Sequence, residues 1–290
     1  MLELKNINVS FRSERQDKIF GYTRQQVLFD VSLSVKKGSC LGILGESGSG
    51  KSTIGRVLCG LLKPDSGEAI LDGIPVYASR SGRRNLQNKL SIVFQDYTTS
   101  ANPRFRIRDI IGEGLAVQER REGKKIDRKA ESERLLELVG LPTEYGERFP
   151  HELSGGMARR VLLCTALMDD PRVIVADEPT PGLDLELAVR AMDDFRAFAN
   201  QGNGVLLITH DIELALRVAD RIAVFKDGTV VEETSVENFA ASTPDGLIHP
   251  FSRELWQALA DLGASDASDG ASSEVHEDGQ FIKEEGGSAC

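Results

Sequence analysis

The sequence predicts an α/β protein in which a mixed sheet carries an inserted helical region. Short apolar segments bounded by turn residues are typical of buried strands, and alternating apolar and polar residues are typical of half-exposed ones. Charged helical patterns dominate from about residue 96 to 169, and strand patterns return after them. The expected strands are residues 2–11, 27–36, 40–44, 67–72, 90–94, 173–176 and 205–208, followed by a hairpin at 221–233.

Asp-Gly pairs mark two turns of this sheet. Asp72-Gly73 follows the strand at 67–72, and Asp227-Gly228 stands between the arms of the hairpin. This pair favours tight hairpin turns because both residues tolerate positive φ. Since the sequence shows no internal repeat, a helical insert within one sheet domain is the simplest arrangement of these elements.

The composition of the chain limits the classes of protein to which it can belong. With 290 residues, 40% of them apolar, the chain can bury a substantial core. No uncharged apolar run reaches 18 residues, and the N-terminus lacks the apolar stretch of a secretion signal, so we expect a cytoplasmic protein. The cysteines have neither metal-ligand nor redox spacing, which favours free thiols over a zinc site or disulfides: Cys40, Cys59, Cys164 and Cys290.

Charge is uneven along the chain. The net charge of −10 argues against a nucleic-acid partner, because a nucleic-acid surface usually shows as a basic stripe. Residues 263–290 carry seven carboxylates against one lysine, and we expect them to form a disordered acidic tail. Before it, residues 236–262 are expected to be a C-terminal extension with a short helix.

A glycine-rich loop follows the strand at 40–44 and precedes a helix. It fits the pattern G-x-x-x-x-G-K-[ST], whose backbone N–H groups cradle phosphates at a helix N-terminus. We expect ATP and Mg²⁺ here, with Lys51 on the β- and γ-phosphates and Ser52 on the metal. The alternative is an ordinary glycine-rich turn. The expected nucleotide-binding residues of this loop are Gly45, Glu46, Ser47, Gly48, Ser49, Gly50, Lys51, Ser52 and Thr53.

Two acidic residues end the apolar strand at 173–176. Asp177 is placed to hold the metal, and Glu178, one residue on, is placed to polarise the attacking water. Many α/β strands end in such a pair, so its significance comes from the phosphate loop earlier in the same chain.

The third motif precedes the helical run at 157–168. Leu153-Ser154-Gly155-Gly156 can be an ordinary helix N-cap, and it can also be a phosphate site. With these three motifs in order, the chain resembles the ABC transporter ATPase family, whose signature is L-S-G-G-Q. Met157 stands where the family usually has Gln, and Arg160 falls on an arginine that the family commonly carries.

The resemblance covers about residues 2–235 and implies further site residues. Gln95 matches a glutamine that touches metal or water and senses the membrane partner. Asp184, in Pro181-Gly182-Leu183-Asp184, matches the D-loop that contributes to the nucleotide site, and His210 matches the switch histidine that contacts the γ-phosphate. The family fold implied is a P-loop NTPase core over residues 1–235, with an antiparallel β subdomain and a helical subdomain at about 96–160.

The sequence leaves open which aromatic residue stacks on adenine. Family members stack adenine on an aromatic residue before the phosphate loop, and Phe11 is in the matching place. Phe20 and Tyr22 compete for the role, and Phe11 could equally be a core residue.

Three features resemble the peptide and nickel importer branch of the family. They are the long loop between the first two strands, the segment from Val93-Phe94-Gln95-Asp96 to Ala101-Asn102-Pro103-Arg104, and His249-Pro250-Phe251-Ser252. The chain resembles the second ATPase of such operons more than the first. A Pro-centred turn before an amphipathic helix is the plain reading of the last segment.

This branch implies an assembly at the cytoplasmic side of the cell membrane. The partners are a second ATPase subunit, identical or paralogous, two transmembrane permease subunits and an extracytoplasmic solute-binding protein. Each ATP would lie between the Lys51 loop of one ATPase and Ser154, Gly155 and Gly156 of the other. The alternatives are an exporter subunit, a non-transport ABC ATPase acting on DNA or ribosomes, and a small-molecule kinase.

Overall fold

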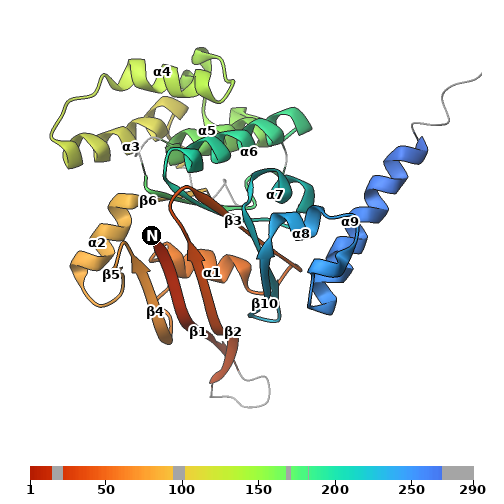
Figure 1. Ribbon diagram of the computed structural model, residues 1–290. Coiled ribbons are helices and arrows are strands. Elements are labelled where there is room, and N and C mark those ends of the chain that lie inside the picture. The colour runs from red at the N-terminus through yellow and green to blue at the C-terminus, as the bar shows by residue number, and fades with distance from the viewer. Residues whose placement is uncertain (15–21, 94–101, 168–170, 182, 270–290) are drawn as a thin grey trace, which may run out of the picture.

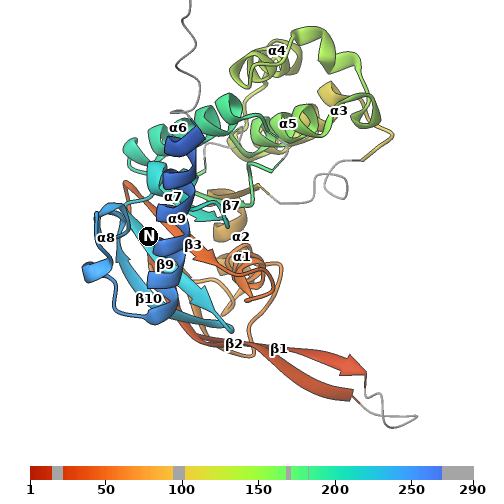
Figure 2. The same ribbon diagram turned by 90° about the vertical axis from the view of Figure 1, so that its right-hand side faces the viewer.

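The computed structural model describes residues 1–14, 22–93, 102–167, 171–181 and 183–269. Two sheets and a separate group of helices make up this part of the chain (Figure 1). The smaller sheet is antiparallel, with order β2-β1-β4-β5, and the far ends of β1 and β2 project beyond the rest of the molecule (Figure 2). Its strands are β1 (Leu2–Glu14), β2 (Tyr22–Val35), β4 (Ser66–Leu71) and β5 (Ile74–Pro75).

The larger sheet is mixed and has the order β10-β9-β3-β8-β7-β6. All neighbouring strands from β9 to β6 are parallel, and β10 pairs with β9 in the antiparallel direction. Asp227 and Gly228 both have positive φ, as the predicted hairpin turn requires. The strands are β3 (Ser39–Gly45), β6 (Leu90–Val93), β7 (Val173–Asp177), β8 (Gly204–Ile208), β9 (Arg221–Lys226) and β10 (Thr229–Ser235).

Strands β7 and β8 are buried along their whole length, which explains their unbroken apolar sequences. On one face, α1 (Lys51–Leu58) and the antiparallel sheet enclose the first core, with residues such as Ile54, Leu28 and Phe225. On the other face, α6 (Leu185–Asn200) and α7 (Ile212–Val218) enclose the second, with residues such as Phe195 and Leu207. Helix α2 (Arg80–Lys89) links β5 to β6.

Three helices lie together (Figure 1), and the last of them also contacts β6 of the large sheet. They are α3 (Ile107–Glu122), α4 (Arg128–Leu138) and α5 (Gly155–Leu167). The short 3₁₀ turns η1 (Thr143–Glu147) and η2 (Pro150–Glu152) lie between α4 and α5. Their apolar faces form a third core that includes Ile111, Leu115 and Leu135. We call α3 to α5 the helical subdomain. The predicted insert was about 96–160, and α5 continues beyond it, with Ala166 in the second core.

The C-terminal extension is longer and more regular than the short helix expected. It comprises α8 (Val236–Ala240), the turn η3 (Pro244–Gly246) and α9 (Pro250–Asp269). One carboxylate of β10, Glu232, accepts hydrogen bonds from the backbone N–H of Ile248 (2.8 Å) and His249 (2.9 Å), which fixes the start of α9. Residues 263–269, which the sequence assigned to the tail, are helical, and residues 270–290 lie outside the described part.

The α/β fold class with its mixed sheet, antiparallel subdomain and helical insert is therefore confirmed. Among the described residues, no helix is long and apolar enough to cross a membrane. The described cysteines are free and buried, as predicted: Cys40, Cys59 and Cys164.

Candidate nucleotide-binding site

Three parallel strands bring the predicted site residues to one edge of the large sheet. The phosphate loop follows β3, Glu178 follows β7, and His210 lies two residues beyond the end of β8. Because these strands are neighbours and run in the same direction, their carboxyl ends meet. Ligands of open α/β sheets bind in the crevice outside such strand ends.

Glycine is required at two positions of the phosphate loop. A Cβ at Gly45 would lie 2.1 Å from the carbonyl oxygen of Phe225, which no side chain can tolerate. Gly50 has φ +106 and stands at the N-cap of α1, where a Cβ would meet Val27 and Leu28. The chain can therefore turn tightly from β3 into α1, and the helix presents its N-terminal N–H groups at the edge of the sheet.

Lys51 is buried inside this loop. Its Nζ donates hydrogen bonds to the carbonyl oxygens of Gly45 (2.7 Å) and Glu46 (2.6 Å). Burial lowers the pKa of Lys51, and the nearby carboxylates of Glu178 and Asp177 act in the opposite direction. The lysine is thus held next to the N-terminus of α1, together with the acidic residues that end β7.

Ser52 and Asp177 form a pair of oxygen donors beside the lysine. The hydroxyl of Ser52 donates to Oδ1 of Asp177 over 3.3 Å. Burial raises the pKa of Asp177, while the Ser52 hydrogen bond acts to lower it. A hydroxyl and a carboxylate at this spacing suit Mg²⁺, which binds proteins through one or two such ligands plus phosphate oxygens. The donor set therefore fits the metal that the sequence predicts.

Glu178 and His210 face each other across the same edge. Nδ1 of His210 lies 2.8 Å from Oε1 of Glu178, and the Thr209 hydroxyl lies 3.4 Å from Oε2. The carboxylate is nearly buried, whereas the imidazole side chain is 71% exposed. Glu178 has φ +50, an uncommon backbone conformation for a residue other than glycine. Such local strain is concentrated at functional sites.

A cavity of about 430 Å³ joins these groups. The sequence did not identify Val27, the first residue of a predicted strand, as part of its wall. Phe11, the expected adenine platform, is exposed on β1 opposite Gln25 and does not line this cavity. Phe20 and the side chain of Tyr22 lie outside the described residues, as does Gln95. The cavity is lined by Val27, Ser47, Gly48, Gly50, Lys51, Ser52, Thr53, Asp177, Glu178 and His210.

The signature residues lie elsewhere, at the start of α5 in the helical subdomain. Ser154 and Gly155 are exposed, and the Ser154 hydroxyl accepts a hydrogen bond from the Met157 N–H (3.3 Å), so the helix-cap interpretation is correct. None of Ser154, Gly155 and Gly156 lines the phosphate cavity. Met157 packs against the third core. Asp184 caps α6, where its Oδ1 accepts the N–H of Leu187 (2.9 Å).

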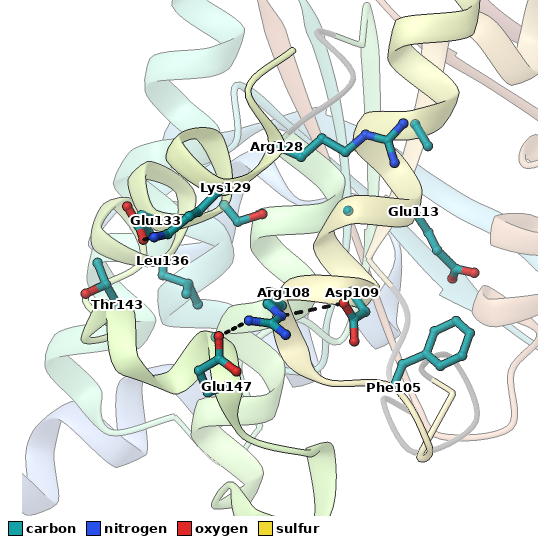
Figure 3. Close-up of a pocket in the computed structure, with 14 residues that line it drawn as sticks. Phe105, Arg108, Asp109, Glu113, Arg128, Lys129, Glu133, Leu136, Thr143 and Glu147 are labelled. Atoms are coloured by element: carbon teal, nitrogen blue, oxygen red, sulfur yellow. Dashed lines mark hydrogen bonds and ion pairs between the residues drawn. The ribbon is translucent and has the colours of Figure 1, made fainter. Parts of the chain in front are cut away.

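A second cavity, of about 480 Å³, lies within the helical subdomain (Figure 3). Its walls come from α3, α4, η1 and Phe105, and they carry charged side chains of both signs. Arg108 pairs with Glu147, and Lys129 lies 3.9 Å from Glu133. None of the residues around the phosphate cavity contributes to it.

The fold and the phosphate cavity define a P-loop nucleotide-binding protein. A family model described as "ABC transporter" matches residues 28–181. The oligopeptide transport ATP-binding protein OppF of Streptococcus mutans is 34% identical, over 89% of this chain and 81% of that protein. The nickel import ATP-binding protein NikE of Brucella suis is 36% identical, over 81% and 87%. This chain belongs to the ABC transporter family and is an ATP-binding, ATP-hydrolysing cassette of it.

Solved structures agree with this assignment. A dimeric ATP-binding cassette in a post-hydrolysis state, bound to ADP and Pi, superposes with a TM-score of 0.72 at 28% identity, covering 81% of this chain and 99% of that one. An ATP-binding subunit of an ABC transporter superposes with a TM-score of 0.68 at 25% identity, covering 89% and 99%. The names of the OppF and NikE relatives confirm the predicted resemblance to the peptide and nickel importer branch.

Proposed function

We propose that this chain is the ATP-hydrolysing subunit of an importer for peptides, nickel or other chelated metal. It works at the cytoplasmic side of the membrane, bound peripherally to two permease subunits, with a second ATPase subunit and an extracytoplasmic solute-binding protein. The observation that supports this most is the gathering of Lys51, Asp177, Glu178 and His210 around one cavity at the strand ends. The import function rests on what the OppF and NikE relatives are named for.

Lys51 binds the β- and γ-phosphates in this proposal. Its ammonium already faces two carbonyl oxygens of the loop, and phosphate oxygens offer it stronger, charge-assisted partners. The backbone N–H groups from Ser47 to Thr53 and the N-terminus of α1 add favourable dipoles. Binding therefore needs little rearrangement of the loop.

Ser52 and Asp177 hold Mg²⁺, with Gln95 assigned to the same ion from sequence alone. A Mg²⁺ ion held there would supply positive charge to the phosphate oxygens. The hydroxyl and carboxylate oxygens are 3.3 Å apart, so both can face one position at the mouth of the loop.

Glu178 orients the water that attacks the γ-phosphate, and His210 contacts that phosphate. Phosphoryl transfer depends mainly on positioning and electrostatic stabilisation, so a nearly buried carboxylate held by a histidine suits the task. His210 remains largely exposed on the cavity side and is free to approach a nucleotide.

Closure of the site is assigned to a second ATPase subunit. Ser154 and Gly155, which are exposed, and the neighbouring Gly156 lie outside the cavity of their own chain and offer a capped helix N-terminus to a partner's nucleotide. Asp184 joins them at this interface. The helical subdomain receives the permease, so that dimer closure opens the transport pathway.

The direction of transport can be tested in vesicles. The chain should be assembled with the permease and solute-binding proteins of neighbouring genes and supplied with ATP and labelled peptide or nickel. Net uptake that needs ATP and the solute-binding protein is expected. Extrusion would favour the exporter alternative, and hydrolysis without any transport would favour a non-transport ATPase.

A further inference from the structure

Helix α2 carries positive charge that the nucleotide site does not use. Between Asp72 and Asp96 the sequence contains four cations and no carboxylate, although the net charge of the whole chain is −10. A local excess of positive charge in an acidic protein favours a negatively charged partner at that place. The four cations are Arg80, Arg83, Arg84 and Lys89.

The packing of α2 directs three of these cations outward. Gly82 and Leu86, one turn apart, are the buried residues of the helix. A Cβ at Gly82 would lie 2.2 Å from the carbonyl oxygen of Pro75, and one at Gly60 would lie 2.9 Å from the Leu86 side chain. The helix is therefore held closely along this one face. The residues on its other faces are exposed, among them Arg80, Arg83 and Arg84.

Among the described residues, the exposed cations at and around α2 are largely unpaired. Lys89 pairs with Asp72 over 2.9 Å. In the same part of the chain, Arg80 and Arg84 have no ion pair. Lys63 is exposed in the turn after α1 that packs against α2, and it has no described ion pair either. Their charge is therefore available to a partner outside the chain.

A second basic segment lies on the same side of the molecule. The turn between α3 and α4 contains Lys124 and Lys125, which are exposed and have no ion pair within the described ranges. In Figure 1 this turn and α2 both lie at the left edge, one in the helical subdomain and the other beside the antiparallel sheet. We use the name basic side for six residues: Lys63, Arg80, Arg83, Arg84, Lys124 and Lys125.

We infer that the basic side contacts the headgroups of anionic phospholipids in the membrane at which this cassette works. The inference rests on the peripheral membrane location in the proposed function. Basic residues near an anionic leaflet are attracted to it over about one Debye length. Because the six cations belong to two separate subdomains and face one way, they suit a broad charged surface better than a single acidic peptide.

This contact leaves the nucleotide site free. Helix α1 begins at the phosphate cavity, and the turn after it packs against α2, so the nucleotide and the basic side lie at opposite ends of one helix. The remainder of the chain is strongly acidic and is repelled by the same leaflet. Attraction on one side and repulsion elsewhere would hold the cassette in one orientation beneath its permease.

The test is co-sedimentation of the full chain with vesicles of phosphatidylcholine alone and of phosphatidylcholine mixed with phosphatidylglycerol. Binding should require phosphatidylglycerol and weaken as salt is raised. Each cation near the surface contributes about a fivefold factor in affinity, so Arg80→Gln/Arg84→Gln should weaken binding about 25-fold. Lys124→Gln/Lys125→Gln should weaken it by a similar factor.

Arg190→Gln/Arg217→Gln is the matched control. These arginines lie on α6 and α7, on the other face of the large sheet, and their side chains are 66% and 47% exposed. The control removes the same charge and should leave vesicle binding unchanged. Melting temperatures show whether each variant is folded. Excess inorganic phosphate should release the chain no better than chloride of equal ionic strength, and a stronger effect of phosphate would mean a site for soluble anions.

Equal binding to both kinds of vesicle, or equal binding by the α2 variant and the control, would overturn the inference and leave the proposed function standing. An α2 variant that keeps vesicle binding but no longer assembles with the permease in detergent would also overturn it, because the partner would then be a protein. ATP hydrolysis and uptake by the assembled wild type are measured separately. Their absence would refute the proposed function even if vesicle binding persisted.

Discussion

The two surfaces assigned to ATP differ in how far one chain completes them. Around the phosphate cavity, the side chains assigned to phosphate, metal and water have partners within the same chain: Lys51 in its loop, Ser52 on Asp177, and His210 on Glu178. At the start of α5, Ser154 and Gly155 are exposed, and the Ser154 hydroxyl serves as the helix cap. In the proposed function, the first surface carries the chemistry, and the second is a binding face for the nucleotide of a partner subunit.

Substitution at Glu178 should show the largest effect on the first surface. Glu178→Gln keeps the shape and the hydrogen bond to His210 but removes the carboxylate that holds water. Turnover in the assembled transporter should fall by about 10²–10⁴-fold, and ATP should still bind and hold the two ATPases together. Steady-state hydrolysis and gel filtration with ATP measure both properties. Glu186→Gln, on the exposed face of α6, is the control, and a wild-type rate in Glu178→Gln would refute the catalytic role.

The second largest effect should be on nucleotide binding. Lys51→Ala removes a cation from the phosphates, and a charge-assisted hydrogen bond contributes about 1.5–3 kcal/mol, or roughly 10–100-fold in affinity. Titration with a fluorescent ATP analogue would measure the loss, with the exposed Lys63→Ala as the control. Equal affinity losses in Lys51→Ala and Glu178→Gln would contradict the division between binding and chemistry.

Substitution of Met157, next to the second surface, should change ATPase activity far less. Its side chain packs against the third core, while the cap on Ser154 uses only its backbone N–H. If the surface works through Ser154 and the helix N-terminus, a glutamine amide adds about 1 kcal/mol at most, a roughly fivefold gain in turnover. The measurement is ATPase activity of the complex with Met157→Gln. A rise of more than about a hundredfold would mean that the native surface is degenerate.

The smallest effect should be on the stability of the folded chain and on how that stability depends on pH. Since burial raises the pKa of Asp177, its ionised form is disfavoured in the folded chain. Below the ordinary pKa of 3.8 the group is protonated in both states and there is no penalty; the penalty grows with pH and is complete above the raised, folded pKa. Asp177→Asn should therefore be more stable than wild type at neutral pH, with a gain that disappears in acid, while losing activity.

Asp193→Asn should change the free energy of unfolding in the opposite direction. Chemical unfolding of both variants and the wild type at several pH values measures the two changes. Arg217 lowers the pKa of Asp193 through a side-chain hydrogen bond, so the ionised form is favoured in the folded chain. That variant should be slightly less stable at neutral pH, and the difference should fade as pH drops through the lowered pKa. If both variants shift stability in the same direction, the assignment of burial as the cause at Asp177 fails.

Motif order in the sequence was enough to predict the first surface, because its parts follow buried strands. The loop that carries Lys51 follows one apolar strand, and Asp177 and His210 come at the ends of two others. Parallel strands align their ends, which brings these residues together. Val27 escaped notice, because its approach to Gly50 depends on how the two sheets pack. The length of α9 was also missed, since its anchor at Glu232 joins residues distant in sequence.

Side-chain contacts between different helices were the part of the site that was hardest to predict. Arg160 could be matched to a family position, but its contact with Gly140 and its open separation from Asp184 depend on how α4, α5 and α6 meet. No periodicity in the sequence reports a distance between helices that lie in different cores. The same holds for Glu178, whose positive φ arises from the turn after β7.

Lys51 has one more consequence, which concerns turnover between cycles. Its two hydrogen bonds to Gly45 and Glu46 give the ammonium partners inside the protein when no phosphate is near. When spent nucleotide leaves, the side chain can return to these carbonyls, and the loop need not collapse around an unpaired charge. Exchange of ADP for ATP then involves a side-chain motion, which is fast, and no refolding of the loop, which is slow. The phosphate loop can therefore keep its conformation between the release of one nucleotide and the binding of the next.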